Sequence, residues 1–168
     1  MSFKFEGTFT IRDGDKILRV AKNNLLYSGA RAILKYLGNL HAAEYTNGIQ
    51  PNYILIGEGN TPNSLVNPFT YTVESYKGLI AISTRTMNPS SAPISDPAFW
   101  NHIRFTATLA SGNVYLIREL ALGVFGTFPT SPTQYSAAVI ARAIVSPAYL
   151  KEAGATKQID YDLRIVPA

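Results

Sequence analysis

The sequence predicts one mainly β domain that carries a single main α-helix. One stretch, residues 24–38, repeats its apolar residues at the 3.6-residue period of a helix with one buried face. The segments before and after it alternate apolar and polar residues at the two-residue period of strands. At 168 residues, with no plausible linker, the chain has the size of one domain. We therefore expect residues 1–168 to form a single domain in which the helix lies on a sheet.

The predicted helix is amphipathic. Leu26, Ile33 and Leu37 fall on one face, while Arg31 and Lys35 fall on the opposite face. A single amphipathic helix needs an apolar surface to cover, and the only partner that the sequence offers is a sheet built from the remaining segments. We expect the helix to pack against that sheet.

Before the helix, residues 8–20 predict a β-hairpin. Two alternating runs are separated by Asp13 and Gly14, a pair of residues that favours a tight hairpin turn. Gly7, just upstream, predicts a kink or a bulge in the first strand. The Asp-Gly-Asp sequence at the turn lacks the later acidic residue of a calcium loop, so turn formation explains it better.

After the helix, the first clear strand is Tyr53–Gly57, a continuous apolar run that predicts a core strand. Residues 69–75 and 79–86 predict a pair of strands joined across residues 76–78. Between these segments, the Gly-x-Gly that follows Tyr53–Gly57 lacks the lysine and helix of a phosphate-binding loop, so we interpret it as a turn.

The C-terminal part predicts four more strands. Residues 103–109 and 114–124 alternate well and predict a second hairpin. Residues 137–146 and 158–166 predict two further strands, and residues 147–157 between them predict a short turn of helix. The whole chain then holds about nine strands and one main helix.

Two proline-bearing loops, residues 87–97 and 126–135, are candidates for contacts between subunits. Long loops without periodicity often carry binding contacts. Trp100, the only tryptophan, closes the first loop and is expected to anchor it. The candidate interface residues are Pro89, Pro93, Ile94, Pro97, Trp100, Phe128, Pro129, Pro132 and Tyr135.

The composition excludes several functional classes. Charged residues make up only 15% of the chain, against about 25% in ordinary soluble domains, which favours burial between subunits. The net charge of +4 includes no run of three consecutive basic residues, so nucleic-acid binding is disfavoured. The absence of cysteine excludes disulfide and thiolate chemistry and suits synthesis in a reducing cytosol. No segment approaches the roughly 20 apolar residues of a membrane span.

The chemical motifs do not point to a reaction. Glu119 and Arg142 both lie inside apolar strands, where an unpaired charge would be costly, so we expect a buried ion pair between them. His41 and His102 have no second ligand at a metal-binding spacing and are expected on the surface or in turns. No nucleophile or Walker motif is present. We therefore expect no catalytic residues, no cofactor and no metal.

Four motifs together resemble small virion structural proteins of tailed bacteriophages. Those proteins place an N-x-x-x-x-x-G helix before an I-G-x-G-x-T-x-P strand and turn, and residues 24–31 (NLLYSGAR) and 56–62 (IGEGNTP) resemble these two motifs in the same order. Residues 117–125 (IRELALGVF) are similar to their I-x-E-x-G-L-F strand, and residues 141–143 (ARA) to the x-R-A strand that follows. Ala121 stands where these proteins usually carry glycine.

The resemblance implies an antiparallel β-sandwich, jelly-roll-like, with the helix packed against it. It also implies a non-enzymatic part that assembles in multiple symmetric copies at the tail, the neck or collar, or the baseplate. The expected partners are further copies of the chain and other virion proteins, without nucleic acid or membrane. The expected location is the virion, after synthesis in the host cytoplasm.

Three alternatives stay open. A capsid decoration (cement) protein would share the same layout. A glycan- or receptor-binding β-sandwich module would use exposed aromatic residues as stacking platforms, with Trp100 as the best candidate for a host-surface glycan. A small hydrolase would need Glu58 or Glu119 in a cleft.

Overall fold

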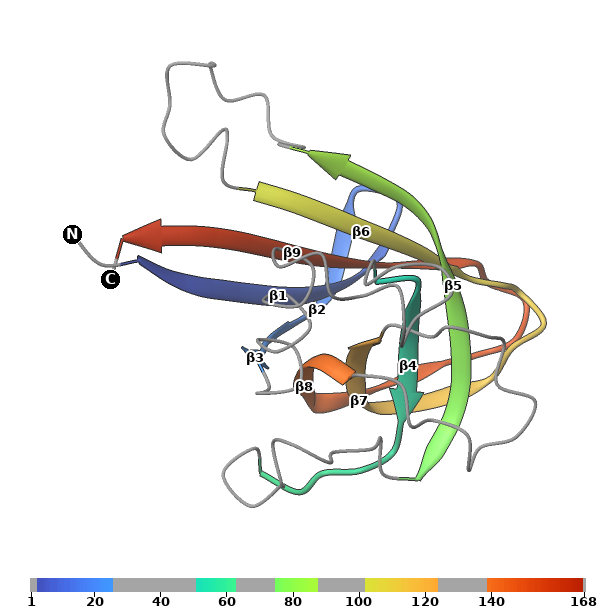
Figure 1. The fold of residues 1–168 in the computed structure, drawn as a ribbon. Helices are drawn as coiled ribbons and strands as arrows, with labels where there is room; N and C mark the ends of the chain where they lie inside the picture. Colours follow the sequence, from blue (N-terminus) through green and yellow to red (C-terminus); the bar gives the residue numbers. More distant parts are fainter. Residues whose placement is uncertain (1–2, 26–50, 63–74, 88–101, 124–138, 168) are drawn as a thin grey trace, which may run out of the picture.

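The computed structural model describes residues 3–25, 51–62, 75–87, 102–123 and 139–167, which form one antiparallel sheet (Figure 1). Within these ranges the structure contains strands and turns and no helix. The order across the sheet is β2-β1-β9-β6-β5-β4-β7-β8-β3. The strands are β1 (Phe3–Asp13), β2 (Lys16–Lys22), β3 (Asn24–Leu25), β4 (Tyr53–Gly57), β5 (Tyr76–Met87), β6 (His102–Leu109), β7 (Tyr115–Gly123), β8 (Val139–Lys151) and β9 (Lys157–Pro167).

The sheet curls until its two ends nearly meet, so the molecule is a nearly closed barrel. β2, near one end of the strand order, packs beside β8, near the other end. Arg19 on β2 bridges them, because its Nε donates to the Pro147 carbonyl at 3.2 Å and its guanidinium lies 5.7 Å from the centre of the Tyr149 ring. Near closure leaves few unpaired strand edges to solvent.

The expected jelly-roll-like β-sandwich with a packed helix is therefore wrong. Asn24 and Leu25, the start of the predicted helix, form β3 and pair with β8. The remainder of that prediction, residues 26–38, lies outside the described residues. Sequence alternation shows only that each strand buries one face, which a sandwich and a barrel both require. Pairings between distant segments, such as β1 with β9, decide between the two architectures.

The main core lies on the inner face of the curled sheet. Phe9 of β1, Phe105 of β6 and Tyr161 of β9 point into it, and each exposes 4% or less of its surface. The rings of Phe9 and Tyr161 lie 4.6 Å apart, which is the range of favourable aromatic pairs. Aliphatic side chains from the other strands complete this core.

β4 is buried on both faces. Ile54 and Ile56 contact the main core, while Tyr53 and Leu55 belong to a second buried cluster on the opposite face. A strand that is buried on both faces has a continuous apolar sequence, and this pattern predicted the strand. The core strand predicted at Tyr53–Gly57 is thus confirmed with the same bounds.

The first predicted hairpin is confirmed. β1 and β2 pair in antiparallel register up to Asp13 and Lys16, and Gly14 has a φ of 55° in the turn between them. This left-handed conformation suits glycine because it carries no side chain. The pairing with β9 runs through Gly7 without a register shift, so of the predicted kink or bulge at Gly7 the bulge is wrong.

The second predicted hairpin is wrong in its pairing, although its strands exist. β6 pairs with β5 and β9, whereas β7 pairs with β4 and β8. The turn between β6 and β7 therefore connects two separated parts of the sheet. Two smaller predictions also fail: residues 76–78 belong to β5, and β8 continues through Pro147 to Lys151 where a helical turn was expected. The strand predicted at residues 69–75 lies outside the described residues except for residue 75.

Candidate functional site

The candidate site lies on the outer face of β1, β9 and β6, opposite the main core. Because neighbouring residues of a strand point to opposite faces, the core residues of β9 leave Asp160 and Asp162 on the outer side. The register sets Asp160 between Thr10 of β1 and Thr106 of β6. One step along the same face, Asp162 lies between Thr8 and Arg104.

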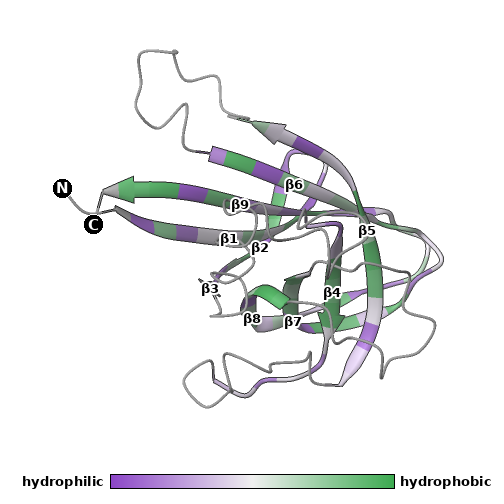
Figure 2. Cartoon of the chain, in the orientation of Figure 1, coloured by the Kyte–Doolittle hydropathy of each residue, from purple (hydrophilic) through white to green (hydrophobic). Residues whose placement is uncertain are grey.

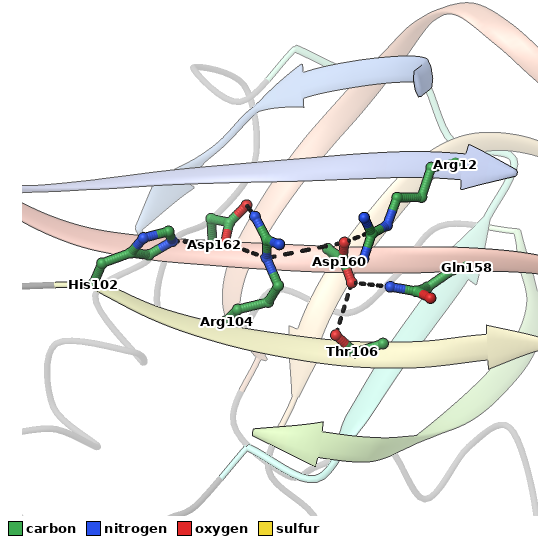
Figure 3. Close-up of polar contacts among 7 residues, drawn as sticks. All are labelled: Arg12, His102, Arg104, Thr106, Gln158, Asp160 and Asp162. Carbon is green, nitrogen blue, oxygen red and sulfur yellow. Dashed lines mark hydrogen bonds and ion pairs between the residues drawn. The ribbon is translucent and has the colours of Figure 1, made fainter. Parts of the chain in front are cut away.

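Asp162 is held by Arg104 and His102 (Figure 3). Arg104 donates to both of its oxygens, from Nε to Oδ1 at 2.8 Å and from Nη2 to Oδ2 at 3.0 Å. His102 Nε2 lies 2.6 Å from Oδ1. Burial alone would raise the pKa of Asp162, but the hydrogen bonds and charges of Arg104 and His102 outweigh it and hold the pKa below its ordinary value.

Asp160 is almost fully buried and has its own set of donors. Thr106 Oγ1 donates to Oδ1 at 2.7 Å, and Gln158 Nε2 donates to the same oxygen at 2.8 Å. Arg12 Nε lies 2.8 Å from Oδ2 in an ion pair. Figure 3 shows Arg104 standing between the two aspartates, with its Nε 3.9 Å from Asp160 Oδ2. The two carboxylates therefore form one continuous charged network.

A groove of about 350 Å³ opens over this network. It crosses four neighbouring strands, because its lining comes from β2, β1, β9, β6 and the turn between β1 and β2. The lining combines hydroxyl, carboxylate and guanidinium groups with one apolar side chain. These residues are Glu6, Thr8, Thr10, Arg12, Asp15, Ile17, Arg104, Asp160, Asp162 and Arg164.

The chemistry of the groove is that of polar recognition. Carboxylates fixed by guanidinium groups present hydrogen-bond acceptors beside donors, in positions that side-chain rotation does not change. Within the described part of the chain, no cluster of three or more His, Cys, Asp or Glu side chains is placed to hold a metal ion. The described residues also include no helix that is long and apolar enough to cross a bilayer.

The structure brings Glu119 and Arg142 together as expected from the sequence. Arg142 Nε donates to Glu119 Oε1 at 2.7 Å, and neither side chain is exposed to solvent. Arg142 Nη1 also donates to the Thr61 carbonyl at 2.7 Å, which ties the turn after β4 to β8. Glu119 is thus held by a guanidinium inside the protein and not placed in an open cleft. Glu58, the other carboxylate considered for hydrolysis, lies 3.5 Å from Lys77 Nζ.

The nine candidate interface residues all fall in residues 88–101 and 124–138, outside the described residues. His41 also lies outside them. His102, expected on the surface or in a turn, is instead on β6 and 5% exposed, because its ring binds Asp162. The outer-face network was missed by sequence reasoning. Its available signal was the alternation of Asp160 and Asp162 along one strand, which places two carboxylates on the same face.

Comparison with family models, with curated proteins and with solved structures found no match to this chain.

Proposed function

We propose that this chain is a non-enzymatic structural component of a tailed bacteriophage virion, assembling in multiple symmetric copies at the tail, the neck or collar, or the baseplate. Under this proposal its partners are further copies of itself and other virion proteins, and it joins the virion after synthesis in the host cytoplasm. The order of the four sequence motifs supports this role. One surface of the described structure supports assembly.

That surface is the distal apolar face, formed by Phe5, Met87, Ile103, Leu163 and Ile165. The register places Met87 beside Ile103 and Ile103 beside Leu163, and it pairs Phe5 with Ile165. All five share the inward-facing side of their strands. Ile103 and Leu163 pack against the main core, and Phe5 and Ile165 lie farther along β1 and β9, near the strand ends that carry the termini (Figure 1).

The distal apolar face is the observation that carries the proposal. Phe5 is 45% exposed, Met87 61% and Ile165 38%, although each continues the face that is buried elsewhere in the barrel. Figure 2 shows an apolar band near the free end of β9, after alternating apolar and hydrophilic bands. Full burial of one large apolar side chain contributes about 1.5–3 kcal/mol, so a second copy seated here would gain from covering several. Contiguous exposed apolar residues of this kind mark protein interfaces.

The outer-face network supports the non-enzymatic part of the proposal. A general acid works best with a pKa near the operating pH, whereas the pKa of Asp162 is held low despite its burial. Asp162 binds Arg104, which favours its ionised form, and Asp160 is held in an ion pair by Arg12. Glu119 is likewise bound by Arg142.

Negative-stain electron microscopy of the purified full chain tests the assembly role. Rings or other closed particles of uniform size are expected, since virion parts assemble with closed symmetry. Their rotational symmetry would then limit the positions that the protein could occupy in the virion. Fields that contain no particle larger than a single 18.3 kDa chain, at every protein concentration imaged, would contradict the proposal.

A further inference from the structure

We propose that the groove on the outer face of β1, β9 and β6 binds a neutral sugar unit of a glycan. The groove is the one described above, with Asp160, Asp162, Arg12 and Arg104 as its fixed polar residues and Ile17 at its rim. It lies on the opposite side of the sheet from the distal apolar face. The inference therefore does not rest on the proposed assembly.

The size and build of the groove suit a small polar ligand. Its volume of about 350 Å³ is at the lower end of the roughly 300–1,000 Å³ of small-molecule sites, enough for one sugar ring. Asp160 is 1% exposed and Asp162 8% exposed, so the two carboxylates beneath the groove are almost fully buried. Side chains fixed in this way lose little conformational entropy when a ligand binds.

Both buried aspartates keep a hydrogen-bond acceptor position. A carboxylate accepts about four hydrogen bonds, two at each oxygen. Asp160 accepts two hydrogen bonds on Oδ1, and its Oδ2 lies in ion-pair contact with Arg12 Nε, which makes no hydrogen bond. Asp162 accepts two hydrogen bonds on Oδ1 and one on Oδ2. One position on each Oδ2 is therefore left for a ligand hydroxyl. A buried acceptor with a spare position gains a hydrogen bond without a new desolvation cost.

Donors stand beside these acceptors. Arg12 Nε lies 2.8 Å from Asp160 Oδ2 but makes no hydrogen bond among the described residues, so it is a buried donor that a ligand could satisfy. Arg104 uses Nε and Nη2 on Asp162, which leaves Nη1 without a partner among the same residues. The hydroxyls of Thr8 and Thr10 add groups that both donate and accept. A sugar hydroxyl also donates and accepts, so alternating donors and acceptors match it.

The charge and the rim of the groove favour a neutral ligand over an ion. Its lining holds four carboxylates and three guanidinium groups, which nearly cancel. An anion would meet the carboxylates of Asp160 and Asp162 beneath the groove, and like charges repel at short range in a partly buried site. Ile17, 60% exposed, offers an apolar contact for the C–H face of a sugar ring. A polyhydroxylated ring can therefore contact both the polar lining of the groove and the apolar side chain of Ile17.

Saturation-transfer difference NMR on the purified full chain tests the inference. The probes are the methyl glycosides of glucose, galactose, mannose and N-acetylglucosamine, each at millimolar concentration, and sodium sulfate serves as the anionic competitor. At least one glycoside is expected to give a signal that sulfate does not displace. A lack of signal from all four glycosides, or full displacement by sulfate, would overturn the proposal.

Two variants and one matched control locate the site. Thr10→Val removes a hydroxyl from the groove, and Arg164→Gln replaces a guanidinium with a shorter neutral amide. Each should weaken binding about 3- to 10-fold, the effect of one lost hydrogen bond. Thr108→Val makes the same change on the outward side of β6, outside the groove lining, and should bind as the wild type does. Equal binding by all three variants would place the sugar elsewhere and overturn the groove assignment.

The experiment separates this inference from the proposed function. Loss of sugar binding in Thr10→Val with particle assembly unchanged would support the groove and leave the assembly role intact. Particles without any sugar binding would overturn the groove inference alone. Sugar binding by a chain that never assembles would overturn the structural role alone.

Discussion

Asp162 keeps its charge with only 8% of its surface exposed, because three donor groups from Arg104 and His102 surround it. This is how a sheet can hold charges on a face with little access to water. The desolvation of the carboxylate opposes ionisation, and the guanidinium and imidazole contacts compensate for it.

The low pKa of Asp162 makes part of the stability dependent on pH. The unfolded chain, with the ordinary aspartate pKa near 3.9, binds more protons than the folded chain below about pH 4. Stability from Asp162 is therefore complete above that pH and is lost as the pH falls through the lower folded pKa. In Asp162→Asn the free energy of unfolding should fall by about 1–3 kcal/mol at pH 7, since the variant leaves Arg104 without its carboxylate.

Urea denaturation at pH 7 and pH 3 checks this prediction. The difference in stability between the wild type and Asp162→Asn should shrink at pH 3, because this pH lies below the unfolded pKa of aspartate and part of the stability from the ionised Asp162 is lost there. Glu152→Gln, at an exposed carboxylate, is the control and should show no such change. A difference that is equal at both pH values would contradict the assignment.

The buried side chain of Lys151 also stabilises the fold. Its Nζ donates to the carbonyls of Ala110, Ser111 and Asn113, at 2.6, 3.2 and 2.6 Å, and so fixes the turn between β6 and β7. Lys151→Met should lower the free energy of unfolding by at least about 1–3 kcal/mol, the cost of a buried polar group left without a partner. Thermal denaturation measures the loss. Lys22→Met, at an exposed position of β2, is the control, and equal melting of the two variants would count against this role.

At the scale of elements, the packing of β1 depends on glycine at position 7, which has no side chain. A Cβ on Gly7 would fall on the Asn23 side chain and on the Tyr161 hydroxyl. These two groups bind each other, because Asn23 Nδ2 donates to Tyr161 Oη at 2.7 Å. Burial raises the pKa of Tyr161, so the phenol stays protonated. Glycine at this position thus allows β1, β9 and the end of β2 to approach closely.

Gly7→Ala should therefore destabilise the fold. Overpacking of this kind costs about 1–3 kcal/mol, since either the Asn23 contact or the strand must shift. Gly112→Ala is a matched control, because a Cβ there meets no atom within 4 Å. Chemical denaturation should show a clear loss for Gly7→Ala and almost none for Gly112→Ala. Equal stabilities would mean that Asn23 moves aside without cost.

The elements that were predictable from sequence are those fixed by local patterns. The continuous apolar run of β4 and the Asp-Gly turn between β1 and β2 need only neighbouring residues to be recognised. Strand partners are decided by contacts far apart in the chain, so the pairing of β6 and β7 was predicted wrongly. The outer-face site depends on the same distant contacts, because Arg104 and Asp162 meet only when β6 lies beside β9. The ion pair between Glu119 and Arg142 could be predicted from the sequence, because each is a charged residue within an otherwise apolar strand.

At the scale of the whole molecule, the two faces of one sheet differ in their chemistry. The inner face builds the main core and continues outward as the distal apolar face. The outer face of β1, β9 and β6 carries the polar groove. Binding of a ligand and contact between copies can therefore take place on opposite sides of the same strands.

Assembly through the distal apolar face is the central claim, and the mass of the purified chain in solution tests it most directly. Static light scattering of the wild type should give a defined multiple of 18.3 kDa. The double variant Phe5→Thr and Ile165→Thr removes apolar area while keeping residues that favour strands, so its mass should fall toward the monomer. Val114→Thr, which changes an exposed apolar residue elsewhere, should keep the wild-type mass. A wild-type mass of one chain at all concentrations, or a double variant that assembles as the wild type does, would contradict the claim.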